Sequence, residues 1–188
     1  MLTRDIERAK KGESDAFATL YDATYDQIYR YIFHRVLDTI HTEDIISIVY
    51  EKALKGIKKF RGTSENELYS WLYQISYTSI IDYSRGSHDI ESLEEVTWEP
   101  VYHEEKGNTL DNKEKLEEVL LYLKTLSEKE RSIITMRIWD DMDYSEIAKI
   151  TGDSEANLRK ITSRTLAKIA SNVSPLAFVS FILIHVWK

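Results

Sequence analysis

The sequence predicts an all-α protein made of two small helical domains that are joined by an acidic linker. Its 188 residues include only 6 glycines and 2 prolines, fewer turn-forming residues than a β sandwich or barrel usually needs. Apolar side chains recur at helical spacing through most of the chain. Two capping boxes, Ser64 with Glu67 and Ser127 with Glu130, mark helix starts. Each domain is large enough to bury a modest core.

The first domain is expected over residues 1–86. Three helices should build it: one over 14–38 with Ser14 as its N-cap, one over 43–59 behind Thr42, and one from the Ser64 capping box to about Gly86. Apolar residues recur every three to four positions along each of them, so one face of each helix can be buried. A compact helical domain follows from this pattern.

Residues 87–114 are expected to be an acidic linker, because they lack helical periodicity and contain Pro100 and Gly107. The net charge of the whole chain is −7, and residues 91–115 alone carry 8 acidic and 3 basic side chains. The acidity is therefore concentrated in one short segment. It does not exclude binding to nucleic acid, because phosphates respond to local basic clusters.

The second domain, residues 115–172, contains the strongest functional pattern. A short helix over Tyr144–Ile150, a tight turn with Gly152 and a helix to about Ser171 together predict a helix-turn-helix. Leu158, Ile161, Leu166 and Ile169 should form the buried side of the last helix. Its other side would offer donors to phosphates and base edges in a major groove. These candidate DNA-binding residues are Glu155, Asn157, Arg159, Lys160, Ser163, Arg164 and Lys168. The alternative is an amphipathic helix whose charged face is merely solvated.

A second basic cluster lies in the first domain, at Lys52, Lys55, Lys58, Lys59 and Arg61. Three tyrosines follow it at four-residue spacing: Tyr69, Tyr73 and Tyr77. Aromatic faces beside a basic groove suit single-stranded DNA, where stacking contributes about 1–3 kcal/mol per base. The alternative is that these rings complete the core and keep their hydroxyls in water.

No catalytic constellation is present in the sequence. The five histidines have no metal-ligand spacing, there is no glycine-rich phosphate loop, and there is no nucleophile motif. We therefore expect neither an enzyme nor a bound cofactor or metal. The chain has no cysteine, and its first residues lack the apolar stretch of a secretion signal, so a cytoplasmic location is expected.

These features together resemble the sigma-70 family of transcription initiation factors, in the compact layout of the extracytoplasmic function (ECF) group. The resemblance is carried by Asp15-Ala16-Phe17, Leu20-Tyr21, Glu43-Asp44-Ile45-Ile46, Phe60-Arg61-Gly62, Trp71-Leu72-Tyr73-Gln74-Ile75, Leu126-Ser127-Glu128-Lys129-Glu130-Arg131, Tyr144-Ser145-Glu146-Ile147-Ala148 and Asn157-Leu158-Arg159-Lys160-Ile161. It covers roughly three quarters of the chain. Among its departures from the family pattern are Ser47-Ile48, in place of the usual Gln-Glu, and Tyr77-Thr78, in place of the usual Arg and Asn.

The resemblance implies a sigma factor that binds core RNA polymerase, recognises the −35 and −10 promoter elements and directs transcription initiation. It implies polymerase contacts at Asp44, Ser47, Ile48 and Glu51. The −10 element would be bound by Lys58, Lys59, Arg61, Tyr69, Tyr73 and Tyr77, and the −35 element by the last helix of the helix-turn-helix. An anti-sigma factor is a further possible partner.

Two other classes of protein remain open at this point. A stand-alone helix-turn-helix transcriptional regulator would bind duplex DNA unaided, with a steep salt dependence. A helical adaptor would bind only protein, and its basic faces would then be solvated. Residues 43–77 distinguish a sigma factor from the stand-alone regulator, because a plain repressor does not need a basic, tyrosine-flanked first domain.

The C-terminal tail, residues 173–188, is almost wholly apolar from Pro175 onwards. As a helix, its last 14 residues would reach about 20 Å, which is too short to cross a membrane alone. Three readings stay open: attachment to a membrane surface, docking on a domain with masking of its DNA-binding face, or the start of a longer apolar segment. Masking predicts that removal of residues 174–188 raises affinity for DNA or polymerase.

Overall fold

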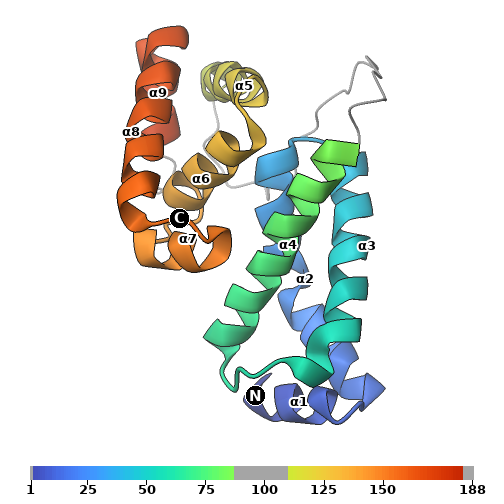
Figure 1. The fold of residues 1–188 in the computed structure, drawn as a ribbon. Helices are drawn as coiled ribbons and strands as arrows, with labels where there is room; N and C mark the ends of the chain where they lie inside the picture. The colour runs from blue at the N-terminus through green and yellow to red at the C-terminus, as the bar shows by residue number, and fades with distance from the viewer. Residues whose placement is uncertain (1, 87–109, 184–188) are drawn as a thin grey trace. The chain divides into compact units, whose positions relative to one another are not determined.

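The computed structural model describes residues 2–86 and 110–183, which form helices joined by short connections, and no strand occurs within these two ranges (Figure 1). The chain divides into two compact units, built mainly on α1–α4 and on α5–α9. The prediction of an all-helical protein with two helical domains is therefore confirmed. Most of the predicted linker, residues 87–109, lies outside the described residues, and its last part is helical because α5 begins at Leu110.

The first unit packs three long helices side by side, with a short helix across one end (Figure 1). Its elements are α1 (Leu2–Lys10), α2 (Ser14–Val36), α3 (Thr39–Gly56), the 3₁₀ helix η1 (Ile57–Lys59) and α4 (Glu65–Gly86). Helix α2 packs against α1, α3 and α4. Ile28, Val49 and Leu72 are among the buried apolar residues between the long helices. This core holds the basic and aromatic faces of the unit in fixed positions.

Three helix starts in this unit differ from the sequence prediction. Helix α1 was not predicted, because only Ile6 and Ala9 among its apolar residues are buried. Ser14 is the first residue of α2 rather than its N-cap, which is Glu13. Helix α3 begins earlier than predicted, at Thr39, because the carboxylate of Asp38 accepts a hydrogen bond from the backbone N–H of His41 at 2.9 Å.

In the second unit, the described residues 110–183 form five helices: α5 (Leu110–Lys124), α6 (Glu128–Ile138), α7 (Tyr144–Thr151), α8 (Glu155–Asn172) and α9 (Pro175–Leu183). The capping box at Ser127 is present in full, with Glu130 as its reciprocal partner. Helices α7 and α8 form the predicted helix-turn-helix. Gly152 adopts a positive φ of 76° in its turn, a conformation that favours glycine. The hydroxyl of Ser154 caps α8 by accepting from the N–H of Asn157.

The buried stripe of α8 differs in part from the predicted one. Leu158 and Ile169 are buried as expected, and Thr162 and Thr165 complete the stripe. Ile161 and Leu166, which were predicted to share it, are only half-buried. The two threonines fit because they fall on the helical positions between Leu158 and Ile169. The opposite side of α8 is therefore not needed for packing within the unit.

The apolar tail docks on the second unit as helix α9. Ala177 and Phe181 are fully buried, and the Phe181 ring meets Trp139 edge-on at a centroid distance of 5.8 Å. The carboxylate of Glu118 accepts hydrogen bonds from the N–H and the hydroxyl of Ser174, at 2.6 and 2.7 Å, and so fixes the start of α9. Of the three readings, docking on protein is the one that the structure supports for residues 175–183.

Residues 175–183, docked as α9, do not cover the predicted DNA-binding residues of α8. Arg159, Lys160 and Arg164 remain exposed with α9 in place. Helix α9 packs against α5 and α8 and leaves these three side chains uncovered. The effect of removing residues 174–188 on affinity stays a prediction. Among the described helices, none is both long and apolar enough to span a lipid bilayer.

Candidate DNA and polymerase interfaces

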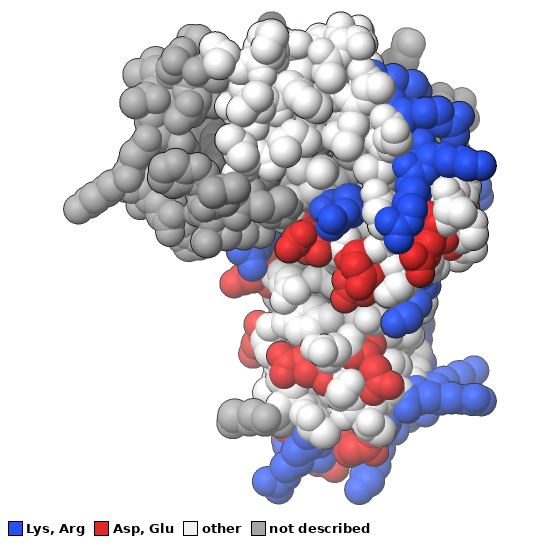
Figure 2. Space-filling model, turned by 90° about the vertical axis from the view of Figure 1, so that its left-hand side faces the viewer, with Lys and Arg blue, Asp and Glu red and all other residues white. Residues whose placement is uncertain are grey.

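The first candidate interface is the exposed side of α8. Six of its seven predicted residues are exposed: Glu155, Arg159, Lys160, Ser163, Arg164 and Lys168. Asn157 is half-buried. Figure 2 shows Lys and Arg side chains gathered along one side of the α5–α9 unit, next to a broad surface without charged side chains. A helix with several cationic side chains on one side is suited to the major groove of DNA, because the phosphates along the groove are negatively charged.

The side chains at the start of α8 are oriented by their neighbours. The Arg159 guanidinium donates to Glu155 at 3.2 Å and lies 4.3 Å from the centre of the Tyr144 ring. The Asn157 amide nitrogen donates to Asp153 at 3.0 Å. One of the two donors of the half-buried Asn157 amide is thus engaged within the protein, whereas Arg159 is 61% exposed and has further N–H groups beside the one that donates to Glu155. Arg159 is therefore the better candidate for contacts to base edges.

Lys168 differs from the other cations of α8, because it forms an ion pair with α6. Its ammonium lies 2.6 Å from the carboxylate of Glu130. The hydrogen bond from Lys168 lowers the pKa of Glu130, with a further contribution from Ser127. The pair joins the C-terminal half of α8 to the capping box of α6, so Lys168 has a structural contact within the unit.

The second candidate interface lies on α4 and the loop before it. Lys58, Lys59 and Arg61 are exposed, as predicted, and Tyr69 and Tyr77 are half-buried. Tyr73 is only 9% exposed. Its hydroxyl accepts a hydrogen bond from Gln27 at 2.6 Å, and its ring lies 4.5 Å from that of Tyr31. The structure places Tyr73 in the core rather than in a row of stacking rings, because the middle of α4 faces α2.

The loop at residues 60–64 is tightly held. The Phe60 ring stacks on Trp71 at a centroid distance of 4.8 Å. A Cβ atom at Gly62 would lie 2.4 Å from the Phe60 ring and 2.8 Å from Cβ of Glu67, so a larger residue cannot fit without movement. The Glu67 carboxylate accepts from the N–H groups of Thr63 and Ser64 at 2.9 and 3.0 Å. The first two contacts give a physical reason for the phenylalanine and the glycine of Phe60-Arg61-Gly62.

The Glu67 contacts make the loop sensitive to acid. Hydrogen bonds from Thr63 and Ser64 lower the pKa of Glu67 from its ordinary value of 4.5. Because the pKa of Glu67 is lower in the folded state, its ionised carboxylate stabilises the folded loop above pH 4.5. This stabilisation is lost as the pH falls through the lowered pKa. We expect amide exchange at Thr63 and Ser64 to accelerate, relative to the intrinsic rate, below that pH. In Glu67→Gln this acid-dependent acceleration of amide exchange should be missing. The same acceleration in Glu67→Gln would contradict the proposed role of the Glu67 carboxylate.

The third candidate interface is one side of α3. Asp44, Ser47 and Glu51 are exposed there, and Ile48 is half-buried, so the structure brings all four predicted polymerase-binding residues onto one helix. The Asp44 carboxylate accepts from the Tyr83 hydroxyl at 3.0 Å. The ammonium of Lys55 forms an ion pair with Glu51 and lowers its pKa.

A tyrosine row beside this face was not predicted as part of the interface. Tyr21, Tyr25 and Tyr29 follow one another along α2, with ring centroids 5.2 and 6.0 Å apart. Burial raises the pKa of both Tyr25 and Tyr29. Tyr21 and Tyr25 line an open groove of about 250 Å³, together with Glu43 and Ser47. Its sequence signal, tyrosine at every fourth position, was available but is also typical of a packed helix.

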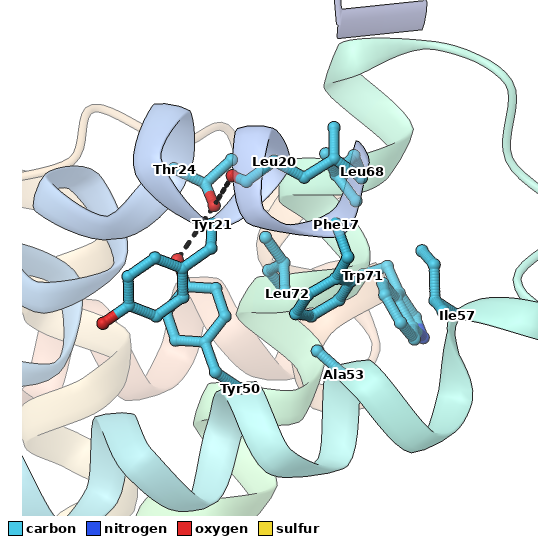
Figure 3. Close-up of a pocket in the computed structure, with 10 residues that line it drawn as sticks. All are labelled: Phe17, Leu20, Tyr21, Thr24, Tyr50, Ala53, Ile57, Leu68, Trp71 and Leu72. Carbon is cyan, nitrogen blue, oxygen red and sulfur yellow. Dashed lines mark hydrogen bonds between the residues drawn. The ribbon is translucent and has the colours of Figure 1, made fainter. Parts of the chain in front are cut away.

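Beneath these surfaces, the first unit contains a closely packed apolar core. Figure 3 shows Phe17 and Trp71 directed toward each other in a cavity of only about 10 Å³. The Thr24 hydroxyl donates to the Leu20 carbonyl at 2.7 Å and pairs with the Tyr50 hydroxyl at 2.8 Å. This cavity is too small for an organic ligand. Within residues 2–86 and 110–183, no group of His, Asp and Glu could hold a metal ion.

A helix-turn-helix with an exposed basic helix, together with a second helical unit that bears a basic loop, defines a DNA-binding protein of two units. Residues 20–88 match sigma-70 region 2, and residues 116–169 match sigma-70 region 4. The chain therefore belongs to the sigma-70 family and is an ECF RNA polymerase sigma factor, which directs transcription initiation. Such factors are not enzymes. The region 2 match accounts for the first unit, which a stand-alone regulator would lack.

Individual relatives are similar over most of the chain. It is 28% identical over 169 residues to the ECF sigma factor BldN of Streptomyces coelicolor, covering 88% of this chain but 63% of BldN. It is 26% identical to YlaC of Bacillus subtilis, covering 85% of this chain and 93% of YlaC. The ECF sigma-E factor of Escherichia coli is also 26% identical, with 91% and 93% covered.

A solved structure, that of CnrH in complex with the cytosolic domain of CnrY, resembles this fold. It has a TM-score of 0.64 and 16% identity, and the alignment covers 90% of this chain and 94% of that chain. At this identity the similarity supports the helical fold alone.

Proposed function

We propose that this sigma factor divides promoter recognition between its two units. Helix α8 would read the −35 element as intact duplex, through Arg159, Lys160 and Arg164. The loop at 60–64 and the exposed side of α4 would hold the −10 element after its strands separate. The observation that supports this division is the difference between the two surfaces: a rigid helix with exposed cations, and a held loop flanked by half-buried tyrosines.

The −35 proposal is based on the exposed donors of α8. Arg159 presents a planar fork that matches the acceptors of guanine in the major groove, and Lys160 and Arg164 can reach phosphates. Glu155, Asn157 and Ser163 lie along the same helix and belong to the proposed surface. Lys168 is proposed at its edge, where its ion pair with Glu130 would compete with a phosphate contact.

The −10 proposal includes Lys58, Lys59 and Arg61 as phosphate or base contacts, with Tyr69 and Tyr77 as stacking rings. Tyr73 is left out, because its ring is buried. Half-exposed tyrosines can stack on an unpaired base while their other side packs on the protein. We expect the held loop to select the base, since a rigid pocket loses little entropy on binding.

The polymerase proposal places the contacts with core RNA polymerase on α3, at Asp44, Ser47, Ile48 and Glu51.

The proposed domain limits are 1–86 for region 2, 87–114 for the linker, 115–172 for region 4 and 173–188 for the tail. CnrH was solved with the cytosolic domain of a second protein, and we propose that an anti-sigma protein likewise holds this chain. We also propose a cytoplasmic location, where the polymerase acts.

The polymerase surface is testable with Asp44→Ala combined with Glu51→Ala. We expect about tenfold weaker binding to core RNA polymerase, because two exposed carboxylates are removed from one interface. Native-gel titration of core polymerase measures the affinity directly. The matched control is Glu117→Ala, an exposed carboxylate of the other unit, which should bind normally. Equal loss in the control would assign the effect to overall charge, and no loss in the double variant would contradict the proposed surface.

A further inference from the structure

Helix α1 reaches the loop at residues 60–64 through the side chain of Lys10, its last residue. The Lys10 ammonium donates to the backbone carbonyl of Gly62 at 2.6 Å and to the carboxylate of Glu7 at 2.7 Å. It also lies 5.4 Å from the centre of the Phe60 ring. The Lys10 side chain is only 16% exposed, and its hydrogen bond to Gly62 is partly shielded from water, whereas its partner Glu7 is 51% exposed.

The contact joins residues that are 52 positions apart in the chain. Glu67 holds the following part of the loop through the N–H groups of Thr63 and Ser64, and Trp71 supports the Phe60 ring from α4. Lys10 therefore holds the loop from the α1 side while α4 holds it from the other. Arg61 is exposed directly before the carbonyl that Lys10 binds.

The charge of Lys10 is balanced within the protein. Glu7 lies one helical turn before it and forms an ion pair with its ammonium. Lys58 and Lys59, in contrast, are exposed. A shielded, paired ammonium that binds a carbonyl is suited to fixing backbone, whereas exposed ammonium groups are suited to binding phosphate.

The turn after α1 lies against the same region. Gly12 has a positive φ of 92°, which allows the chain to reverse between α1 and α2. A Cβ atom built at Gly12 would lie 3.4 Å from Cε of Lys58, in ordinary contact. Helix α1 also packs against η1, which carries Lys58 and Lys59. The end of α1 thus supports both the basic cluster and the loop.

We propose that Lys10 is a positioning residue for −10 recognition: it fixes the Gly62 carbonyl and so presents Arg61 and Thr63 to the separated strand in one conformation. This inference rests on the proposed role of the loop in holding the −10 element. The advantage is preorganisation, because a loop that is already ordered loses less entropy when it captures a base. Lys10 itself does not contact the DNA.

The test uses full-length Lys10→Met, which keeps the length of the side chain but removes its donor and charge. In complex with core polymerase, we expect it to bind the single −10 strand of the mapped promoter about tenfold more weakly. Its preference for that strand over one with a changed −10 base should fall by a similar factor. Lys10→Arg, which restores a charged donor, should recover most of both.

Lys11→Met is the matched control, because Lys11 is an exposed lysine next in the chain and carries the same charge. It should keep normal strand binding and base preference. Core-polymerase affinity should be unchanged in all three variants. Thermal unfolding should be unchanged in Lys10→Arg and Lys11→Met, whereas Lys10→Met should unfold at a somewhat lower temperature because it loses a part-buried hydrogen bond. A second substitution, Lys10→Gln, replaces Lys10→Met if that protein does not fold.

Arg61→Ala separates this inference from the proposed function. If Arg61→Ala weakens strand binding and Lys10→Met does not, the loop binds DNA and the positioning role of Lys10 is wrong. If neither variant has an effect, the proposed role of the loop itself is wrong. An equal loss in Lys10→Met and Lys11→Met would be an effect of charge and would also overturn the inference.

Discussion

Replacement of Phe181 by alanine should destabilise the second unit by about 3–5 kcal/mol, the usual cost of emptying a fully buried phenylalanine site. The Phe181 side chain is 0% exposed and its ring packs edge-on against Trp139. The residue lies beyond the segment that matches region 4, which ends at residue 169. The prediction therefore tests whether the tail is part of the folded unit. Urea unfolding followed by circular dichroism measures the free energy of unfolding.

Val179→Ala is the control for this substitution, because it truncates an apolar side chain on the outer face of the same helix. Val179 is 51% exposed, so its loss should change the free energy of unfolding by less than about 1 kcal/mol. If Phe181→Ala costs no more than Val179→Ala, α9 does not dock on the unit in solution.

Arg159→Ala combined with Lys160→Ala should lower transcription from a −35-dependent promoter by about a hundredfold. In the proposed complex each of these side chains makes a base or phosphate contact, and a good bidentate base contact alone contributes about 1–3 kcal/mol of discrimination. Both residues are exposed, so the fold should be unaffected. Run-off transcription with reconstituted polymerase measures the effect, on the natural promoter and on one with a changed −35 element.

The double variant should lose most of its advantage on the natural promoter and should still bind core polymerase normally. Lys124→Ala, at the exposed end of α5, is the control for removal of a cation from the same unit. Loss of polymerase binding in the double variant would mean that α8 belongs to the polymerase interface instead of the DNA interface.

The parts of the structure that could be predicted are those with local signals. The two capping boxes begin their helices because the hydroxyl and carboxylate that form them lie within four residues. The helix-turn-helix was predictable from the short helix over Tyr144–Ile150, the glycine in the tight turn and the longer helix that follows. The exposure of Arg159 and Lys160 follows from helical spacing around Leu158.

The parts that could not be predicted depend on contacts between distant residues. Helix α1 carries few apolar residues, and its position is set by packing on α2 and by Lys10 at Gly62. Tyr73 shares its spacing with Tyr69 and Tyr77, but only the packing of α4 on α2 buries it. The apolar tail was recognisable as unusual, whereas its docking site on α5 and Trp139 depends on the tertiary structure.

The division of promoter recognition is tested most directly by site-specific photo-cross-linking in the complex with core polymerase and promoter. A photoreactive residue is placed at Ser163, on the exposed side of α8, or at Thr63, in the loop at residues 60–64. The first should cross-link to the −35 duplex and the second to the separated −10 strand. Cross-links from Ser163 to polymerase alone, or from Thr63 to duplex DNA outside the −10 element, would contradict the division.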